Sequence, residues 1–356
     1  MHDRQTNVLP VDALAPASAS IERAAMLLRN GELVVFPTET VYGLGANALQ
    51  AAAVEQIFLA KGRPFSDPLI VHIAAEETLA LLTSHVPRQA RLLAEAFWPG
   101  PLTLLLPAGP RVPRVITAGL ETVAVRMPRH PVALALIRAL GSPIAAPSAN
   151  RFMHISPTTA QHALADLAGR VPLILDSGPC AVGVESTILD LCAPVPTILR
   201  PGGIGLEALR AILPNVQLPQ RRPTTSNEAS DEKAQKAPGQ LLIHYAPGVP
   251  TYLFEGTAEA MRAAMLTEVR NRQRQGELVG VLVADEDLAA FQESGACIYT
   301  LGSAPEQIAA HLFAGLRTLE EAGVQTILCR SFAEHGLGLA VRDRLHKAAG
   351  GKVVYV

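Results

Sequence analysis

The chain has few aromatic side chains and no excess of positive charge. Phe, Trp and Tyr make up 4% of its 356 residues, with a single Trp, and 30 Lys and Arg residues are balanced by 32 Asp and Glu residues. This composition disfavours a base-stacking platform and carries no electrostatic signature of a protein that coats nucleic acid. We therefore expect any RNA contact to be local and weak.

Cysteines are scarce and long apolar runs are missing. The four cysteines, Cys180, Cys192, Cys297 and Cys329, are far apart and form no C-x-x-C pair. We therefore expect reduced thiols rather than zinc ligands or disulfides. The sequence contains no uncharged run of about 18 apolar residues, so a membrane span is not predicted. The first residues lack the apolar segment of a signal peptide, which favours a cytoplasmic location.

Several catalytic signatures are absent as well. The chain has no G-x-x-x-x-G-K-[ST] phosphate loop, no hydrolase triad order and no pair of histidines at metal-ligand spacing, so no metal site is predicted. Gly43-Leu44-Gly45 resembles a dinucleotide fingerprint, but it does not follow the preceding strand directly. A plain turn explains these glycines at least as well as a cofactor does.

The most informative stretch runs from Glu32 to Ile73. A β-branched and aromatic run predicts a buried strand that ends at Pro37, and a loop rich in hydroxyl groups and glycine follows. Residues 49–60 have helical periodicity, and Gly62 is a plausible residue to end this helix. Lys61 and Arg63 place two cations at the same helix end. A second strand comes next. These groups lie at one end of a predicted sheet, where an anionic ligand is expected to bind.

The length of the chain favours two domains, because one domain usually has about 100–200 residues. Residues 1–215 mix hairpin-like and crossover connections, which favours an α/β domain with a mixed sheet. Residues 221–240 contain no large apolar side chain, and we interpret residues 216–247 as a linker. In residues 248–356 strands alternate regularly with helices, which predicts a smaller, doubly wound parallel sheet.

Three cations stand out in the first half. Lys61 and Arg63 have the ordinary explanation of complementing a helix end, but neighbouring glycines, hydroxyls and Asp67 favour a phosphate site. Arg holds phosphate bidentately and Lys adds a point charge, which suits a triphosphate. Arg126 lies in an otherwise apolar strand and needs an anionic partner. A structural carboxylate and a substrate carboxylate are about equally good candidates.

Other polar residues mark the ends of further predicted strands. Each has an ordinary explanation by itself, such as a turn for Pro147–Asn150 or a helix cap for Ser156. Residues 158–168 are expected to form a helix with Ser156 or Thr158 as its cap. Gly183–Thr187 and Arg200–Gly203 add hydroxyls and a cation beside glycine. Together these strand ends predict one lined cavity. His72, on an apolar strand, is of a kind that is more often a satisfied core residue than a catalyst.

These residues belong to longer motifs that resemble the Sua5/YrdC/YwlC family of L-threonylcarbamoyladenylate synthases. The motifs are Pro37–Leu44, Lys61–Pro64, Phe97–Thr103, Val123–Pro128, Ala146–Asn150 and Gly183–Ile188. The linker followed by His244-Tyr245-Ala246-Pro247 and a second α/β domain is similar to the two-domain Sua5 form. The resemblance implies a YrdC-like twisted mixed sheet with helices around a cavity, plus a smaller Rossmann-like parallel α/β C-terminal domain.

The resemblance also implies a reaction. The enzyme would be a nucleotidyltransferase that joins L-threonine, bicarbonate and ATP into threonylcarbamoyl-AMP and releases pyrophosphate. ATP is then a substrate whose phosphates carry Mg²⁺. The product would feed the t6A modification of adenosine 37 in tRNA, and other proteins would transfer it to the tRNA.

The resemblance assigns roles residue by residue. The residues expected to bind L-threonine are Thr40, His72, Arg126, Ala146 and Ser186, with Arg126 on the carboxylate. The residues expected to bind ATP are Arg63, Asp67, Thr122, Ser148, Ser156, Arg200 and Tyr245. The residues expected to carry the catalysis form the K-x-R and S-x-N signatures, namely Lys61, Arg63, Ser148 and Asn150.

Three segments depart from the family pattern. Phe152-Met153-His154 replaces a Ser-Gly pair, and Asp176-Ser177-Gly178 replaces Asp-Gly-Gly. Residues 237–244 replace Ser-Pro-Gly-Met and a basic run. The resemblance nevertheless implies that the linker folds over the first domain's cavity as a lid.

Two other functions fit parts of the sequence. The first is an RNA-binding or ribosome-maturation module without catalysis, which the charge balance and the few aromatic residues disfavour. The second is carbamoyl transfer of the hydrogenase-maturation type. It calls for added acylphosphatase and zinc-finger modules, and the lack of paired C-x-x-C motifs argues against it.

Overall fold

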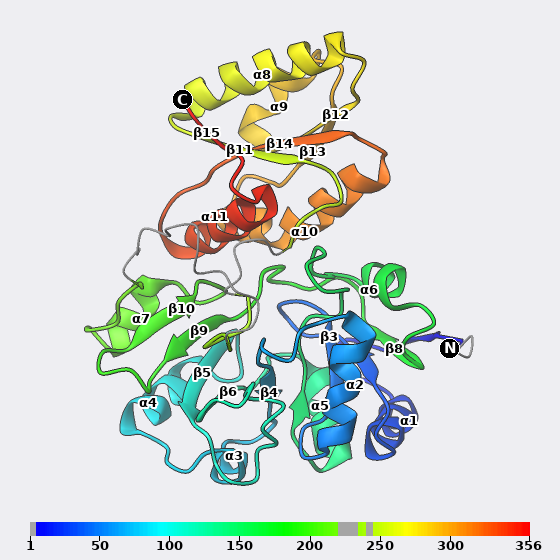
Figure 1. Ribbon diagram of the computed structural model, residues 1–356, viewed down its shortest axis with the longest axis vertical. Helices are drawn as coiled ribbons and strands as arrows, with labels where there is room; N and C mark the ends of the chain where they lie inside the picture. Colours follow the sequence, from blue (N-terminus) through cyan, green and yellow to red (C-terminus); the bar gives the residue numbers. More distant parts are fainter. Residues whose placement is uncertain (1–4, 220–233, 240–244) are drawn as a thin grey trace. The chain divides into compact units, whose positions relative to one another are not determined.

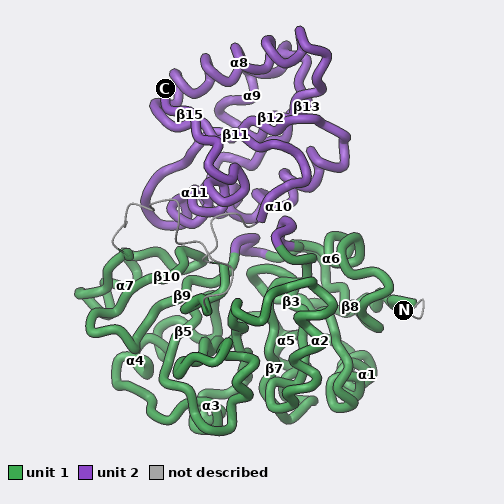
Figure 2. Tube along the Cα trace, in the orientation of Figure 1, with its two compact units in different colours: residues 1–152, 157–180, 185–240 green, residues 153–156, 181–184, 241–356 purple. Residues whose placement is uncertain are grey.

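The computed structural model describes residues 5–219, 234–239 and 245–356. They form two compact units (Figure 2). Unit 1 comprises Met1–Phe152, Pro157–Cys180 and Glu185–Gln240, and unit 2 comprises Met153–Ser156, Ala181–Val184 and Leu241–Val356. Most of the predicted linker, residues 220–233 and 240–244, lies outside the described residues.

Unit 1 is built on a ten-stranded sheet in the order β1-β8-β2-β3-β7-β4-β6-β5-β9-β10 (Figure 1). The pairing is mixed, as predicted: β2 is antiparallel to β3, whereas β4 is parallel to β6. The strands are β1 (Asn7–Pro10), β2 (Val34–Phe36), β3 (Gly43–Asn47), β4 (Ile70–His72), β5 (Leu102–Pro107), β6 (Thr122–Arg126), β7 (Ile144–Ala145), β8 (Leu173–Asp176), β9 (Thr187–Asp190) and β10 (Thr197–Arg200).

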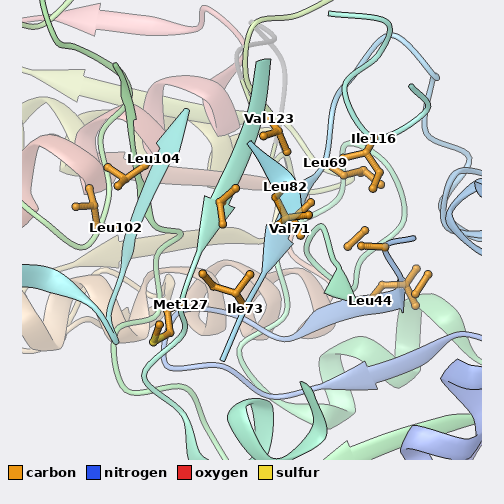
Figure 3. Close-up of a cluster of buried hydrophobic side chains, with 14 of the residues drawn as sticks. Leu44, Leu69, Val71, Ile73, Leu82, Leu102, Leu104, Ile116, Val123 and Met127 are labelled. Atoms are coloured by element: carbon orange, nitrogen blue, oxygen red, sulfur yellow. The ribbon is translucent and has the colours of Figure 1, made fainter. Parts of the chain in front are cut away.

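Helices cover both faces of this sheet unequally. They are α1 (Ser18–Arg29), α2 (Ala51–Lys61), η1 (Glu76–Thr78), α3 (Leu79–Leu82), α4 (Arg88–Phe97), α5 (Pro131–Leu140), α6 (Ala160–Leu167) and α7 (Leu206–Ile212). On one face, side chains of α2, α3, α4, α6 and α7 join a core that includes Leu44, Val71, Leu104 and Val123 (Figure 3). On the other face, α1 and α5 pack against β2, β7 and β8 and against Leu9 of β1.

The rest of that second face carries a small apolar cluster without helices. Its buried members are Ile70, Leu105, Ala124, Ile188 and Ala237, and no helix residue of the described chain belongs to it. The first four come from strands β4, β5, β6 and β9. Ala237 comes from the linker and is fully buried. We call this half of the second face the open face.

The segment from Gly43 to Asn47 is a strand, and its interpretation as a turn is wrong. All five of its residues are buried. A Cβ on Gly45 would lie 2.8 Å from the Phe36 ring and 2.9 Å from Ile144 Cγ2. Glycine is therefore required here by close packing between strands rather than by a turn conformation.

One of two predictions about helix ends is confirmed and the other is wrong. Gly62 ends α2 in the left-handed conformation, with φ of 67°, as glycine in this position commonly does. The proposed helix cap at Ser156 or Thr158 is wrong, because the Thr159 side chain accepts from His162 N at the start of α6. Strand β1, which pairs with β8, was not predicted.

Unit 2 contains an all-parallel five-stranded sheet in the order β13-β12-β14-β11-β15. Helices α8 and α9 lie on one face and α10 and α11 on the other (Figure 1), so the predicted doubly wound arrangement is confirmed. The elements are β11 (Thr251–Glu255), α8 (Ala258–Arg274), β12 (Val279–Val283), η2 (Asp285–Asp287), α9 (Leu288–Phe291), β13 (Cys297–Thr300), α10 (Pro305–Glu321), β14 (Thr326–Arg330), α11 (Gly336–Ala349) and β15 (Val353–Tyr355).

Candidate active site

Arg126 lies at the end of β6 on the open face and is almost completely buried. Its Nη1 donates to Thr40 Oγ1 at 2.9 Å and its Nε donates to the Gly100 carbonyl at 3.2 Å. Its Nη2 lies 2.7 Å from Glu39 Oε2 in a buried ion pair. Of the two partners that the sequence allowed for Arg126, the structure therefore shows the structural carboxylate, which is Glu39. A buried cation of this kind is stable only with such a partner.

A row of polar residues crosses the sheet beside Arg126. His72 and Thr103 are its direct neighbours in β4 and β5. Thr103 Oγ1 is 2.7 Å from Ser186 Oγ, and Arg200 Nη2 donates to Ser186 Oγ at 3.1 Å. Four of the predicted site residues, Thr40, Arg126, Ser186 and Arg200, are thus connected by hydrogen bonds or through Thr103.

His72 is buried beside this row and has no hydrogen bond on Nδ1. Burial, and secondarily the nearby Arg126 charge, lowers the pKa of His72 to about 3. Its ring meets the Phe36 ring edge-on at 6.1 Å. His72 is therefore neutral at physiological pH, and it is not the satisfied core residue that the sequence suggested. Ala146, another predicted threonine ligand, donates its backbone N–H to the carbonyl of Ile70 in the same strand as His72.

Lys61 joins α2 to the loop that follows β7. Its ammonium donates to the carbonyls of Ser148, at 2.6 Å, and of Asn150. Burial, reinforced by the Arg63 charge, lowers the pKa of Lys61 well below its usual value. The K-x-R and S-x-N signatures are therefore in direct contact. As placed, Lys61 orders the loop that carries the Ser148 hydroxyl.

Arg63 and Asp67 form a second buried ion pair, with Nη2 and Oδ2 2.9 Å apart. Arg63 also donates to the carbonyls of Asp67 and Pro68, at the start of β4. Burial raises the pKa of Asp67, and the positive charges of Arg63, Lys61 and Arg200 oppose this rise. Three cations thus act on one carboxylate at this end of the open face.

Thr122 begins β6 and shares a face with Ala124 and Arg126, because alternate strand residues point the same way. Four residues of strand separate Thr122 from Arg126 by about 13 Å, since each residue advances about 3.3 Å. Thr122 and Arg126 therefore lie at the two ends of β6 on the open face.

The linker contacts this face at three described points. Gln235 N donates to the carbonyl of Ser66, and Arg200 Nη1 donates to the carbonyl of Pro238 at 3.3 Å. Between them, Ala237 packs in the apolar cluster of the open face. Residues 234–239 therefore lie across the strands that carry the polar row.

Two predicted nucleotide residues belong to unit 2. Ser156 is buried there. Tyr245 is also buried, with its ring 5.5 Å from that of Phe313 and 5.2 Å from the guanidinium of Arg344. The predicted nucleotide residues are thus divided between the two units.

The sequence reasoning missed Glu39 and Thr103. Both lie inside motifs that had been singled out, but only the structure brings Glu39 to Arg126 and Thr103 to Ser186. The available signal was the need of a buried arginine for an anionic partner, and Glu39 is the one carboxylate in the hydroxyl-rich Pro37–Leu44 motif.

The described part of the chain contains no group of three or more His, Cys, Asp or Glu side chains arranged to hold a metal ion. Among the same residues, no helix combines the length and the apolar character that crossing a membrane requires.

Two family models match the chain in succession. The model named for Sua5, YciO and YrdC, described as "Telomere recombination", matches residues 26–202. The model described as "Threonylcarbamoyl-AMP synthase, C-terminal domain" matches residues 204–350.

Curated relatives and a solved structure match nearly the whole chain. Threonylcarbamoyl-AMP synthase of Pyrococcus abyssi is 45% identical, over 94% of this chain and 96% of the relative. That of Bacillus subtilis is 45% identical, over 96% of both chains. The crystal structure of P. abyssi Sua5 complexed with L-threonine superposes with a TM-score of 0.91 at 43% identity, covering 98% of this chain and 99% of the other.

Proposed function

Because the chain belongs to the Sua5/YrdC family, we propose that it is a threonylcarbamoyl-AMP synthase, which joins L-threonine, bicarbonate and ATP and releases pyrophosphate. The observation that carries this proposal is the polar row on the open face of unit 1. It runs from Thr40 and Arg126 through Thr103 and Ser186 to Arg200. Such a row suits an amino acid that lies beside nucleotide phosphates.

L-Threonine is assigned to the Arg126 end of the row. Arg126 binds the carboxylate, since a buried guanidinium is the strongest available partner for it. Neutral His72, the hydroxyls of Thr40 and Ser186, and the backbone at Ala146 surround the rest of the amino acid. Glu39 is assigned a positioning role, because its ion pair with Arg126 fixes the guanidinium before the substrate arrives.

ATP is assigned to the opposite part of the open face. Arg63 and Arg200 approach its phosphates, with Asp67, Thr122 and Ser148 beside them. Lys61 acts together with Asn150 by holding the Ser148 loop in place. Ser156 and Tyr245, which belong to unit 2, remain predicted nucleotide residues on the family resemblance alone. Mg²⁺ arrives on the phosphates, because the charged triphosphate is its natural ligand.

The reaction brings two anionic reactants together, the carbamate of threonine and the triphosphate of ATP. The threonine amine condenses with bicarbonate, with loss of water, to give a carbamate. A carbamate oxygen then attacks the α-phosphorus, and the bond to the β-phosphate oxygen breaks as pyrophosphate leaves. The protein needs no covalent nucleophile, because fixed cations position both reactants and stabilise the departing charge.

The linker is assigned the role of a lid. Residues 234–239 already cross the open face and contact Ser66 and Arg200. Excluding water there strengthens the interactions between the phosphates and the cations. The proposal also covers the fate of the product. Threonylcarbamoyl-AMP is used for the t6A modification of tRNA, and other proteins transfer it to the tRNA. This protein itself makes at most a weak tRNA contact, and its location is the cytoplasm, as expected from the sequence.

The test is pyrophosphate release from ATP by the full-length protein, with threonine and bicarbonate each left out in turn. We expect release only with all three substrates, and at least a tenfold loss in Arg63→Ala. Arg138→Ala is the matched control, because Arg138 is exposed in the last turn of α5, which also ends at a left-handed glycine. Unchanged turnover in Arg63→Ala would remove that residue from the mechanism. Strong tRNA binding without turnover would instead favour the RNA-binding function.

A further inference from the structure

Unit 2 contains a cavity of about 540 Å³ at the carboxyl edge of its parallel sheet. Its wall includes residues that follow four different strands: Gly256 after β11, Ala284 after β12, Ser303 after β13 and Ser331 after β14. Sites for small molecules commonly have volumes of about 300–1,000 Å³. The cavity therefore has the size of a ligand site, and none of its residues belongs to the site proposed above.

The topology of the sheet places this cavity where ligands bind in open α/β sheets. Strands β12 and β14 are neighbours and parallel. The chain leaves β12 through α9 toward β13 at one edge, and it leaves β14 through α11 toward β15 at the other edge. Connections that diverge in this way open a crevice beyond the carboxyl ends of the two strands.

Two long helices begin at the cavity. Pro305 and Ile308 of α10 and Gly336 and Gly338 of α11 are part of its wall. A Cβ on Gly338 would lie 2.4 Å from the Ala333 carbonyl oxygen, so the loop before α11 lies directly against the first turn of that helix. The positive ends of both helix dipoles favour an anionic group in the cavity.

Arg330 adds a fixed cation to the wall. Only 7% of this residue is exposed, and its Nε and Nη2 lie 2.9 Å from Asp287 Oδ2 and 2.5 Å from Glu286 Oε1. Its guanidinium carbon is 5.0 Å from the centre of the Phe332 ring. Within the described residues, Nη1 makes no hydrogen bond or ion pair. The two N–H donors of Nη1 in a rigidly held arginine are thus left for a ligand.

The remaining wall provides a second kind of surface. Met261, Ile308, Phe332 and Val341 are apolar, whereas Glu286 and Glu306 are exposed carboxylates. An apolar wall suits a flat ring, and carboxylates at such sites accept hydrogen bonds from ribose hydroxyls. One ligand class combines an anionic group, hydroxyl donors and a flat ring.

We propose that this cavity binds a nucleoside monophosphate, with its phosphate at Arg330 and the start of α11 and its base against Phe332 and Met261. The site is additional to the ATP site of unit 1. It would give the C-terminal domain a ligand of its own. The proposal does not depend on the reaction assigned to unit 1, because no residue is shared.

The first experiment is equilibrium dialysis of radiolabelled AMP against full-length protein that carries Arg63→Ala, which weakens the nucleotide site of unit 1. We expect one AMP to remain bound per chain. Adding Phe332→Ala should weaken this binding at least tenfold. The matched control is Tyr252→Ala, which removes another aromatic ring under an arginine of the same domain. The Tyr252 ring is 4.5 Å from the Arg272 guanidinium and lies outside the cavity.

A second variant and a mapping measurement complete the test. Arg330→Lys keeps a cation beside Asp287 but removes the two free Nη1 donors, so it tests the phosphate contact even if Phe332→Ala fails to fold. Inorganic phosphate and adenosine should each displace AMP, and hydrogen exchange should slow in residues 331–341 when AMP binds. Absence of bound AMP in the Arg63→Ala protein would overturn the proposal. Equal affinity in Arg330→Lys and its parent, or protection only in unit 1, would overturn it too.

Discussion

Arg126 illustrates how a single buried charge organises the threonine end of the site. Its partners are Glu39, Thr40 and the Gly100 carbonyl, all from loops beside the sheet. Burying an arginine costs free energy that only an anion and good hydrogen bonds recover. A substrate carboxylate that binds here meets a guanidinium already held in one orientation.

Glu39→Gln should therefore lower the free energy of unfolding by about 3 kcal/mol, because it leaves Arg126 buried without its counter-charge. L-Threonine should stabilise this variant more than it stabilises the wild type, since the substrate carboxylate replaces the lost charge. Urea unfolding with and without L-threonine measures both effects. L-Threoninol, which lacks the carboxylate, is the control ligand, and equal stabilisation of both proteins by L-threonine would contradict the assignment of Arg126.

His72 leads to a prediction about pH. Its pKa is about 3 in the folded protein and 6.5 in the reference state. Between these values the unfolded chain binds more protons, so stability falls as the pH falls. In this window stability falls by about 1.4 kcal/mol for each pH unit. Above pH 6.5 both states hold His72 neutral, so no stability is lost through this group.

Unfolding of the wild type and of His72→Gln should be measured from pH 7 to pH 4. The variant lacks the buried imidazole, so its stability should depend less steeply on pH. His85→Gln is a suitable control, because it removes an exposed imidazole of unit 1. Parallel curves for wild type and His72→Gln would show that His72 is not the group responsible.

Strand β3 shows how an element depends on its neighbours. Gly43 and Gly45 lie in the same strand and on the same side, but their surroundings differ. A Cβ on Gly43 would have its closest contacts at 3.3–3.4 Å, whereas a Cβ on Gly45 would have contacts at 2.8 and 2.9 Å. The pairing of β3 between β2 and β7 leaves no room at Gly45.

Gly45→Ala should destabilise unit 1 by about 1–3 kcal/mol, which is the usual cost of overpacking a core. Gly43→Ala is the matched control and should cost less. The double variant Gly45→Ala/Phe36→Leu should recover part of the loss, because it removes ring atoms that the new methyl group meets. Urea unfolding measures all three variants. Equal losses in the two single variants would contradict the packing argument.

The division of the chain into two units sets the whole-molecule prediction. All five predicted threonine residues belong to unit 1, and so do the core clusters on both faces of its sheet. Tyr245 belongs to unit 2, where it packs against Phe313. Amino-acid binding and ATP turnover should therefore respond differently to loss of unit 2.

A chain that ends at residue 239 should fold and bind L-threonine with an affinity close to that of the full protein. Its pyrophosphate release should fall at least tenfold, because Tyr245 and the attachment of the lid to unit 2 are missing. Calorimetry measures binding, and the pyrophosphate assay measures turnover. Circular dichroism of the shortened chain verifies its folding. Full turnover by the shortened chain would argue against the lid.

Much of the architecture was predictable from local pattern. Alternating strands and helices predicted the parallel sheet of unit 2, and mixed connections predicted the mixed sheet of unit 1. The glycine after Lys61 predicted a helix end. These features depend on periodicity, turn residues and helix caps, which act within a few residues of one another.

The family motifs in the sequence also determined which residues were candidates for the site. They did not determine that Glu39 would pair with Arg126, that Thr103 would join Ser186, or that Ala237 would cover the open face. Gly45 was interpreted as a turn residue because its constraint comes from Phe36 and Ile144 on neighbouring strands. The physical reason is common to all four cases. Contacts between residues far apart in the chain depend on strand order and register, and local spacing does not specify these.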